Sequence, residues 1–263
     1  MVLTQEQIEE QGKLHFEAIK TRKLLTPPSY LYPDMGYDDA YAIASAMVKE
    51  YQKAGFTESG KKVGLTSNVM RKHAGISEPD YGIIFHELCY SNESDVEFEK
   101  FAQPLIEAEL CFKLSKDLQG ESISVEQVLA STEYIVPALE IVDIRQKIDN
   151  PRKIFDTVAD NASFGAYVLG DTPIKPYQID LGLVGFVFEH NNHQVEVSCG
   201  AAVLDHPAKS VAWLAKRFTQ LGNPLKAGEM VMSGSAITIL AAQKGDNFRC
   251  RYGRLGEVSA NFV

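Results

Sequence analysis

Two glutamates in one apolar segment are the first residues whose types and spacing suggest chemistry. Glu107 and Glu109 lie in PLIEAELCFKL, residues 104–114. The segment alternates like a strand, so its apolar side chains share one face and both glutamates share the other. Neighbouring carboxylates repel each other unless they reach solvent or share a cation. A solvated strand face is the simpler interpretation, and a shared cation is the alternative.

A third glutamate favours the shared cation. Glu140 lies in EYIVPALEIVD, residues 133–143, where an unpaired charge among apolar neighbours would be costly to bury. Three carboxylates without Cys or His form an oxygen-only site, which suits Mg²⁺ or Mn²⁺ rather than zinc or copper. A 2-oxo or 2-hydroxy carboxylate could occupy the remaining positions on the ion, which would stabilise enolate charge as it develops.

Two further charged residues are candidates for proton transfer. Lys62 opens KVGLTS, and Asp80 lies in the Pro-containing turn EPDYG. Each alone is interpreted as a surface charge. If both border the metal site, they form an acid/base pair, because neighbouring opposite charges shift each other's pKa.

The polar segment DTVADNAS, residues 156–163, has two interpretations. It is either a loop in which Asp and Asn cap the backbone, or a source of hydrogen bonds from Asn161 and Ser163 to a bound anion. Both interpretations stay open at this stage.

Helices are expected at the start of the chain. Thr4 and Gln7 form a capping box that predicts a helix to about Lys23, and the Pro-rich TPPSYLYPDMG, residues 26–36, reads as a loop. Apolar residues at helical spacing predict a second helix over 40–54. The Gly/Ser/Lys-rich FTESGKK, residues 56–62, reads as a connector, so we expect a helical segment over 1–56 and a β-rich catalytic domain over 57–263.

Short apolar or alternating runs dominate from Lys62 onward and predict strands. Only two helices are expected to interrupt them, over 124–131 and 207–221. This order indicates an α+β fold with mixed β-structure rather than repeated βαβ units. No glycine-rich nucleotide-binding motif occurs. The runs are KVGLTS, YGIIF, PLIEAELCFKL, EYIVPALEIVD, AYVLG, LVGFVFE, HQVEVSC, EMVMSG, AITILAA, NFRCRY and EVSANFV.

The amino-acid composition disfavours several classes of protein. The 263 residues carry 26 basic and 35 acidic side chains, a net charge of -9, which disfavours binding to nucleic acid or anionic lipid. No apolar run approaches the length of a membrane span, and the polar N-terminus lacks the layout of a secretion signal. Four widely separated cysteines fit reduced thiols, so a cytoplasmic location is expected.

Several segments, taken in order, resemble the 2-keto-4-pentenoate hydratase family of the fumarylacetoacetate hydrolase superfamily. The resemblance covers roughly residues 55–263. Three other segments resemble the branch that hydrates 2-oxohept-4-ene-1,7-dioate. The family segments are KVGLTS, EPDYG, IEAEL, VPALEIVD, DTVADNAS, LDHP and YGRLGEVSANFV, and the branch segments are RKIFDT (152–157), PIKP (173–176) and HPAKSVAWLA (206–215).

The resemblance implies a mixed β-sheet roll of the fumarylacetoacetate hydrolase C-terminal type, preceded by helices. It implies that Glu107, Glu109 and Glu140 bind Mg²⁺ and that Lys62 and Asp80 transfer protons. With Asn161 and Ser163, we expect Ser233, at the start of SGSAITIL, to contact substrate.

The implied activity is Mg²⁺-dependent hydration of a 2-hydroxyalka-2,4-dienoate to a 4-hydroxy-2-oxoalkanoate in aromatic catabolism. Substrate chain length stays open. One alternative is 4-oxalocrotonate decarboxylation on the same metal platform, although Asp80 in EPDYG favours hydration. Another is a non-catalytic partner that stabilises a sister pathway enzyme. The family also implies a homo-oligomer.

Overall fold

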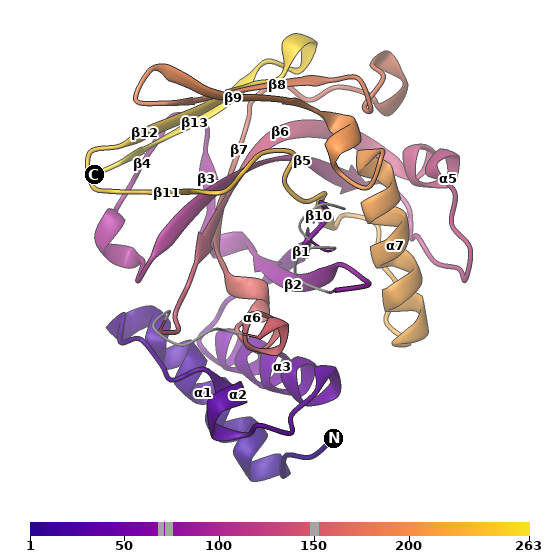
Figure 1. Ribbon diagram of the computed structural model, residues 1–263. Coiled ribbons are helices and arrows are strands. Elements are labelled where there is room, and N and C mark those ends of the chain that lie inside the picture. The colour runs from indigo at the N-terminus through magenta and orange to yellow at the C-terminus, as the bar shows by residue number, and fades with distance from the viewer. Residues whose placement is uncertain (68–70, 72–75, 148–152) are drawn as a thin grey trace.

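The computed structural model describes residues 1–67, 71, 76–147 and 153–263. Its N-terminal part holds three helices, α1 (Gln5–Thr21), α2 (Pro28–Leu31) and α3 (Tyr37–Lys53). Thr4 caps α1 by accepting from the Gln7 amide, and the Gln7 side chain accepts from the Thr4 amide. Apolar faces of α1 and α3 pack together and against α6 (Ile154–Ala159), so these helices lie at one end of the molecule (Figure 1).

The main sheet has eight strands and carries the glutamate segments. Seven lie in the order β2-β1-β10-β5-β6-β7-β3, and β11 pairs with β5. The β1/β10 and β3/β7 pairs are parallel and the others antiparallel, so the sheet is mixed. The strands are β1 (Glu58–Gly64), β2 (Asp80–Phe85), β3 (Cys89–Ser91), β5 (Pro104–Leu114), β6 (Thr132–Asp143), β7 (Phe164–Leu169), β10 (Met230–Met232) and β11 (Leu240–Ala241).

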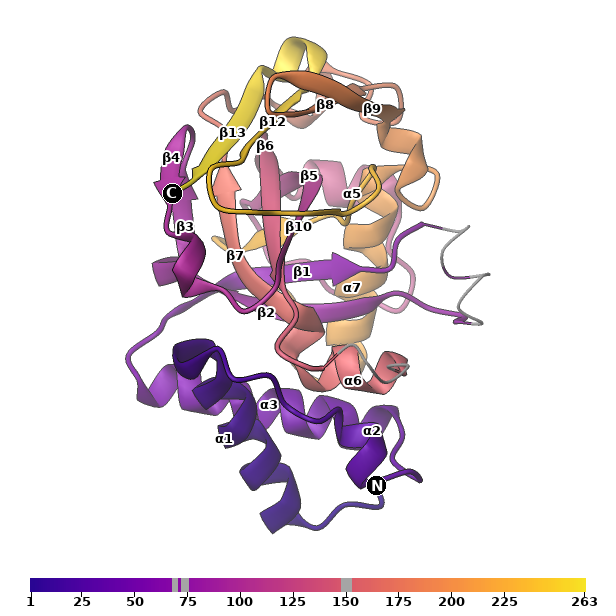
Figure 2. The same cartoon turned by 60° about the vertical axis from the view of Figure 1, so that its left-hand side comes forward.

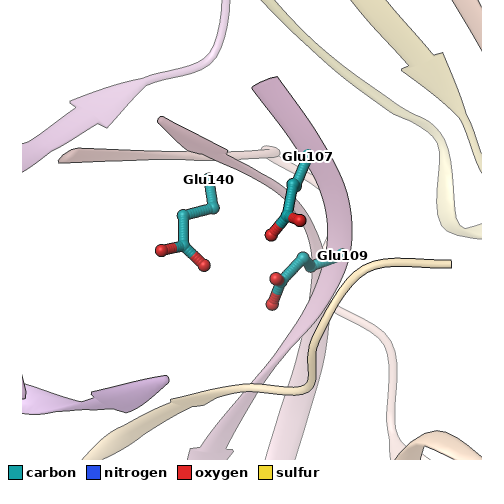
Figure 3. Close-up of side chains that lie close together, drawn as sticks. All are labelled: Glu107, Glu109 and Glu140. Atoms are coloured by element: carbon teal, nitrogen blue, oxygen red, sulfur yellow. The ribbon is translucent and has the colours of Figure 1, made fainter. Parts of the chain in front are cut away.

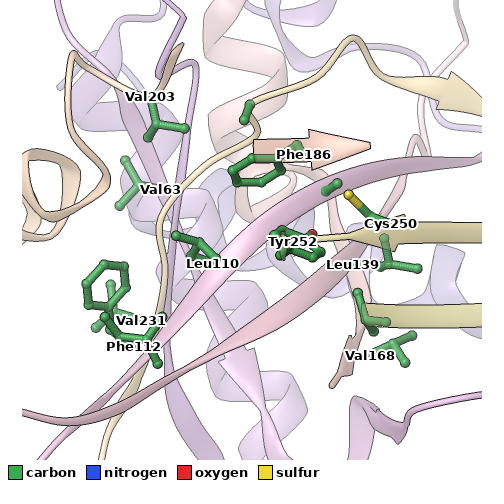
Figure 4. Packing of buried hydrophobic residues seen from close by; sticks show 14 of the residues in the cluster. Val63, Leu110, Phe112, Leu139, Val168, Phe186, Val203, Val231, Cys250 and Tyr252 are labelled. Carbon is green, nitrogen blue, oxygen red and sulfur yellow. The ribbon is translucent and has the colours of Figure 1, made fainter. Parts of the chain in front are cut away.

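A second, five-stranded sheet runs β4-β13-β12-β8-β9 and lies over one face of the first (Figure 2). Its inward side chains join those of β5 and β6 in the largest apolar cluster, which the helix α7 also covers (Figure 4). These elements are β4 (Ser94–Val96), β8 (Gly185–His190), β9 (His193–Cys199), β12 (Asn247–Arg251), β13 (Glu257–Phe262), α5 (Val125–Ala130) and α7 (Pro207–Gln220). Short 3₁₀ turns are η1 (His86–Leu88), η2 (Phe98–Lys100), η3 (Asn161–Ser163), η4 (Pro176–Gln178), η5 (Gly200–Ala202) and η6 (Gly253–Leu255).

The mixed α+β fold and the four helices expected from capping and periodicity are confirmed. Two expected loops contain short helices instead: α2 lies in TPPSYLYPDMG, and α6 ends inside DTVADNAS. Four and six residues are too few to show a helical period. The statement that only two helices interrupt the later chain was therefore wrong.

The prediction that FTESGKK is a connector was also wrong in part, because strand β1 already begins at Glu58. Position 60 of this strand requires glycine, because a Cβ there would overlap the Met230 carbonyl of β10. Only Leu240 and Ala241 of the expected strand AITILAA are β-structure. The first residue of RKIFDT, Arg152, lies outside the described residues.

The division at residue 56 stays a prediction. The helical segment does share a buried cluster with the sheet, in which Phe16, Met47 and Tyr51 meet Phe85 and Cys111. Within the described part of the chain, no helix has the length and apolar character needed to cross a membrane.

Candidate metal centre and proton-transfer site

The three glutamates converge from two adjacent strands. Strands β5 and β6 pair antiparallel with Glu107 opposite Glu140 and Glu109 opposite Ala138. The even-numbered apolar residues of β5, such as Ile106 and Leu110, enter the large apolar cluster on the opposite face. One carboxylate oxygen from each glutamate lies within 4.8 Å of the others, and all three side chains point toward one another (Figure 3).

Burial decides between the two interpretations of this face. Glu109 and Glu140 are both 0% exposed and Glu107 is half-buried, so the solvated strand face is wrong. Burial, reinforced by the charge of Glu140, raises the pKa of Glu107 to about 7 and that of Glu109 well above the usual range. Burial also raises the pKa of Glu140, against the opposing effect of Lys62. This cluster needs positive charge if all three carboxylates are to be ionised at neutral pH.

A divalent cation fits these residues. Glu109 Oε1 and Glu140 Oε2 are buried and face no hydrogen-bond donor among the described residues. The other Glu109 oxygen, Oε2, accepts from the backbone amide of Gly234 at 2.8 Å, which fixes the orientation of the carboxylate. Fixed carboxylate oxygens with free lone pairs form the ligand set that Mg²⁺ or Mn²⁺ prefers.

Lys62 and Asp80 border the same cluster on neighbouring strands. The Nζ of Lys62 lies 3.3 Å from Glu140 Oε1, and the side chain is 4% exposed. Burial alone would lower the pKa of Lys62, but the charges of Glu140 and Asp80 raise it overall. Asp80 is buried next to Gly64, where any Cβ would overlap the Asp80 carboxylate. Burial raises the pKa of Asp80 although Lys62 opposes the shift.

The three residues expected to contact substrate differ in whether their side chains already have hydrogen-bond partners in the protein. Asn161 uses its side chain on β2: Nδ2 donates to the Ile83 carbonyl and Oδ1 accepts from the Ile83 amide, both at 2.8 Å. The Ser233 hydroxyl lies 3.3 Å from the Leu110 amide and 3.4 Å from the Gly234 carbonyl. The Ser163 hydroxyl is buried and has no hydrogen-bond partner within the described residues.

Two positioning features escaped sequence reasoning. The Gly234 amide that orients Glu109 belongs to a loop, and the only sequence signal was a glycine between two serines. The Asn161 clamp on Ile83 depends on three consecutive residues with φ near +50°, Asn161, Ala162 and Ser163. Asn tolerates this region, but nothing in the sequence marks Ala and Ser as adopting it.

No protein-family model matches the chain, but individual relatives match it along almost its whole length. The chain is 40% identical over 260 residues to a 2-keto-4-pentenoate hydratase of Paraburkholderia xenovorans, covering 99% of this chain and 96% of that one. It is 38% identical over 252 residues to a 2-oxo-hept-4-ene-1,7-dioate hydratase of Escherichia coli, covering 94% of each.

Solved structures share the fold. The 4-oxalocrotonate decarboxylase from Pseudomonas putida G7, complexed with magnesium and adipate, gives a TM-score of 0.96 at 30% identity, covering 100% of this chain and 99% of that one. Fumarylpyruvate hydrolase from Pseudomonas aeruginosa, in complex with Mn²⁺ and pyruvate, gives 0.59 at 14% identity over 77% of this chain and 88% of that one, a likeness of fold alone. With curated relatives near 40% identity along almost its whole length, the chain belongs to the hydro-lyase family of 2-keto-4-pentenoate hydratase, on the fold of the fumarylacetoacetate hydrolase superfamily.

Proposed function

We propose that this protein hydrates a 2-hydroxyalka-2,4-dienoate, of the pentadienoate or 2-oxohept-4-ene-1,7-dioate type, to a 4-hydroxy-2-oxoalkanoate in aromatic catabolism. The observation that carries the proposal is the cluster of Glu107, Glu109 and Glu140 with Lys62 and Asp80 beside it. Hydratases of such substrates are among its relatives, including a 2-hydroxyhexa-2,4-dienoate hydratase of Comamonas testosteroni at 37% identity.

Glu107, Glu109 and Glu140 would hold Mg²⁺ or Mn²⁺ in this proposal. The bound ion would supply electrostatic stabilisation of the substrate's C1 carboxylate and of the negative charge that develops on its C2 oxygen. Two neighbouring structures of the decarboxylase contain magnesium and calcium, and the hydrolase contains Mn²⁺. These structures therefore support a divalent cation in the site without identifying which ion it is.

Lys62 and Asp80 would move the protons. The 2-hydroxyl of the dienol loses a proton and C5 gains one, which gives a 2-oxo-3-enoate. Water then adds its oxygen at C4 and a proton at C3. The raised pKa of Asp80 allows its carboxyl to hold a proton nearer neutral pH than a surface aspartate does, and the Lys62 ammonium offsets the charge of the carboxylates around it.

Ser163 would contact the substrate through its free hydroxyl, because a buried hydroxyl without a partner is costly unless a ligand satisfies it. Asn161 and Ser233 would act on the substrate site by holding Ile83 and the Gly234 loop in place, since their side chains already bond to the backbone there.

Product analysis tests the reaction. Purified protein with Mg²⁺ should convert 2-hydroxypenta-2,4-dienoate to a product 18 mass units heavier, about the mass of one water, as absorbance of the diene falls. Asp80→Asn should retain divalent-ion binding and lose turnover by about 10²–10⁴-fold, the usual contribution of general acid–base catalysis. No water gain on any dienoate by a protein that binds Mg²⁺ would reject the hydratase proposal.

Decarboxylation is the second candidate, and the TM-score of 0.96 to 4-oxalocrotonate decarboxylase is the observation in its favour. Incubation with 4-oxalocrotonate distinguishes the two reactions, because decarboxylation releases CO₂ and hydration does not. Absence of both turnover and metal binding would favour a non-catalytic partner of a pathway enzyme. We also propose a homo-oligomer, which light scattering coupled to size-exclusion chromatography tests directly.

A further inference from the structure

Tyr252 opens the closing segment YGRLGEVSANFV, to which the proposed reaction assigns no role. Its side chain is 0% exposed in the large apolar cluster, on the face of β5 and β6 opposite the three carboxylates. The ring packs edge-on against Phe186, with ring centroids 4.6 Å apart, and lies beside Leu110 and Leu139 (Figure 4). Packing alone would need only a phenylalanine here.

The hydroxyl of Tyr252 reaches the backbone where the two ligand strands meet. It donates to the Ala138 carbonyl at 2.9 Å. Ala138 is directly opposite Glu109 in the ladder and two residues before Glu140. The hydroxyl therefore bonds to β6 at the level of the carboxylate cluster, at the point where β6 pairs with Glu109 of β5.

A tyrosine hydroxyl keeps its proton at neutral pH and remains a hydrogen-bond donor. A hydroxyl inside an apolar cluster is costly unless it is hydrogen-bonded, and this cost holds it against the backbone. The backbone at Glu109 and Ala138 sets where the Glu109 and Glu140 side chains begin. Cation affinity is sensitive to such outer contacts, because ligand oxygens must meet the ion at fixed distances.

We propose that Tyr252 is a positioning residue for the metal centre, which holds the β6 backbone beside Glu140 and opposite Glu109 from the other face of the sheet. The inference rests on the proposed function only in that Glu107, Glu109 and Glu140 bind a divalent cation. It does not depend on which reaction follows.

Titration with Mn²⁺, followed by electron paramagnetic resonance of the free ion at 25 °C, tests the proposal. Tyr252→Phe should bind Mn²⁺ about three- to tenfold more weakly than the unaltered protein, at or below the usual range for outer contacts of a metal site. Tyr51→Phe is the matched control: Tyr51 is 1% exposed, and its hydroxyl has no hydrogen-bond partner among the described residues. Its Mn²⁺ affinity should not change.

Each outcome decides between the proposals. A folded Tyr252→Phe protein with unaltered Mn²⁺ affinity overturns the positioning role, even if its melting temperature falls. An unaltered protein that binds no Mn²⁺ removes the metal site itself and with it both proposals. If Tyr252→Phe does not fold, Phe186→Leu loosens the Tyr252 ring and keeps the hydroxyl; weaker Mn²⁺ binding then supports the role, and unaltered binding rejects it.

Discussion

At the scale of single residues, the surroundings of Glu109 support its proposed role as a metal ligand. It is fully buried, one oxygen is held by Gly234, and the other has no hydrogen-bond partner among the described residues. Ionising it without a cation is unfavourable because burial and the charge of Glu140 both oppose the charged form. In the proposed site, Glu109 would therefore become ionised as the cation binds.

Glu109→Gln removes one ligand and one repelling charge. We expect Mn²⁺ to bind at least about 100-fold more weakly, since even outer contacts of a metal site contribute up to this much. The melting temperature of the metal-free protein should stay the same or rise, because an acid with a raised pKa destabilises the folded state above its unfolded pKa. Calorimetric titration and thermal unfolding measure both effects. Glu133→Gln, at an exposed position of β6, is the control, and tight Mn²⁺ binding by Glu109→Gln would contradict the ligand assignment.

Gly234→Ala should damage the same ligand through the backbone. Gly234 has φ +92°, and a Cβ there would overlap Thr66. We expect a loss of about 1–3 kcal/mol in the free energy of unfolding, together with weaker Mn²⁺ binding because the amide that holds Glu109 moves. Gly228→Ala is the control, since Gly228 has φ +88° with open space around it. Equal Mn²⁺ affinity in both variants would show that the Gly234 amide does not orient the ligand.

At the scale of elements, the sequence could predict those features that depend on residues close together in the chain. Capping at Thr4 and Ser124 and the apolar period of α3 and α7 depend on neighbouring residues, so these helices were predictable. Alternation placed Glu107 and Glu109 on one face of a strand. It could not show that this face is buried, because burial comes from strand order and from helices distant in the sequence.

The turn η3 is an element whose role is to fix β2, which carries Asp80. Arg145 anchors the preceding residue, with Nε 2.7 Å from Asp160 Oδ1, and donates to the Phe164 carbonyl after the turn. Between these anchors, Asn161 bonds both backbone groups of Ile83, as a neighbouring strand would. A side-chain amide thus replaces a strand at this edge of the sheet.

Asn161→Asp exchanges the donor that bonds the Ile83 carbonyl for an acceptor. We expect the free energy of unfolding to fall by about 2 kcal/mol, because a buried carbonyl then faces a carboxylate oxygen. Turnover should fall as β2 and Asp80 shift, while Mn²⁺ affinity changes little. Urea denaturation, steady-state rates and Mn²⁺ titration check these effects, with the exposed Asn223→Asp as control. Unaltered stability would mean that the clamp contributes nothing.

At the scale of the whole molecule, a buried polar network joins the N-terminal helices to the sheet. Asp156 of α6 accepts from the Ser29 amide and hydroxyl at 2.8 and 2.7 Å. His15 of α1 contacts the Gln11 carbonyl through Nδ1 at 2.8 Å and Gln146 Nε2 through Nε2 at 3.0 Å. With a proton on Nδ1 alone, His15 donates to Gln11 and accepts from Gln146, so both ring nitrogens are satisfied in the neutral form.

This network makes stability depend on pH. Burial lowers the pKa of His15 below its ordinary 6.5, against the opposing charge of Asp160. Above pH 6.5 the ring is neutral in both states; below it, the unfolded chain binds a proton that the folded protein excludes, so folding is weakened as pH falls. The free energy of unfolding should drop by up to about 1.4 kcal/mol per pH unit from this residue alone until the folded pKa is reached.

His15→Gln should remove that part of the pH dependence. Urea denaturation with chelator at pH 7.5, 6.5 and 5.5 should give a smaller decrease for the variant than for the unaltered protein, by about the amount stated above. His193→Gln, at the exposed start of β9, should keep the original dependence. Parallel curves for His15→Gln and the unaltered protein would show that His15 does not titrate with unfolding.

The pairing of β5 with β6 has a consequence for how the chain avoids misfolding. Glu107 lies opposite Glu140, with the three clustered glutamates on one face and apolar residues such as Ile106 and Leu139 of the large cluster on the other. If either strand slipped by one residue during folding, its whole set of side chains would exchange faces. Carboxylates would then enter the apolar cluster, where no cation could reach them, and their desolvation would disfavour the slipped pairing. The glutamates proposed to bind the cation would therefore also favour the correct pairing of the two longest strands.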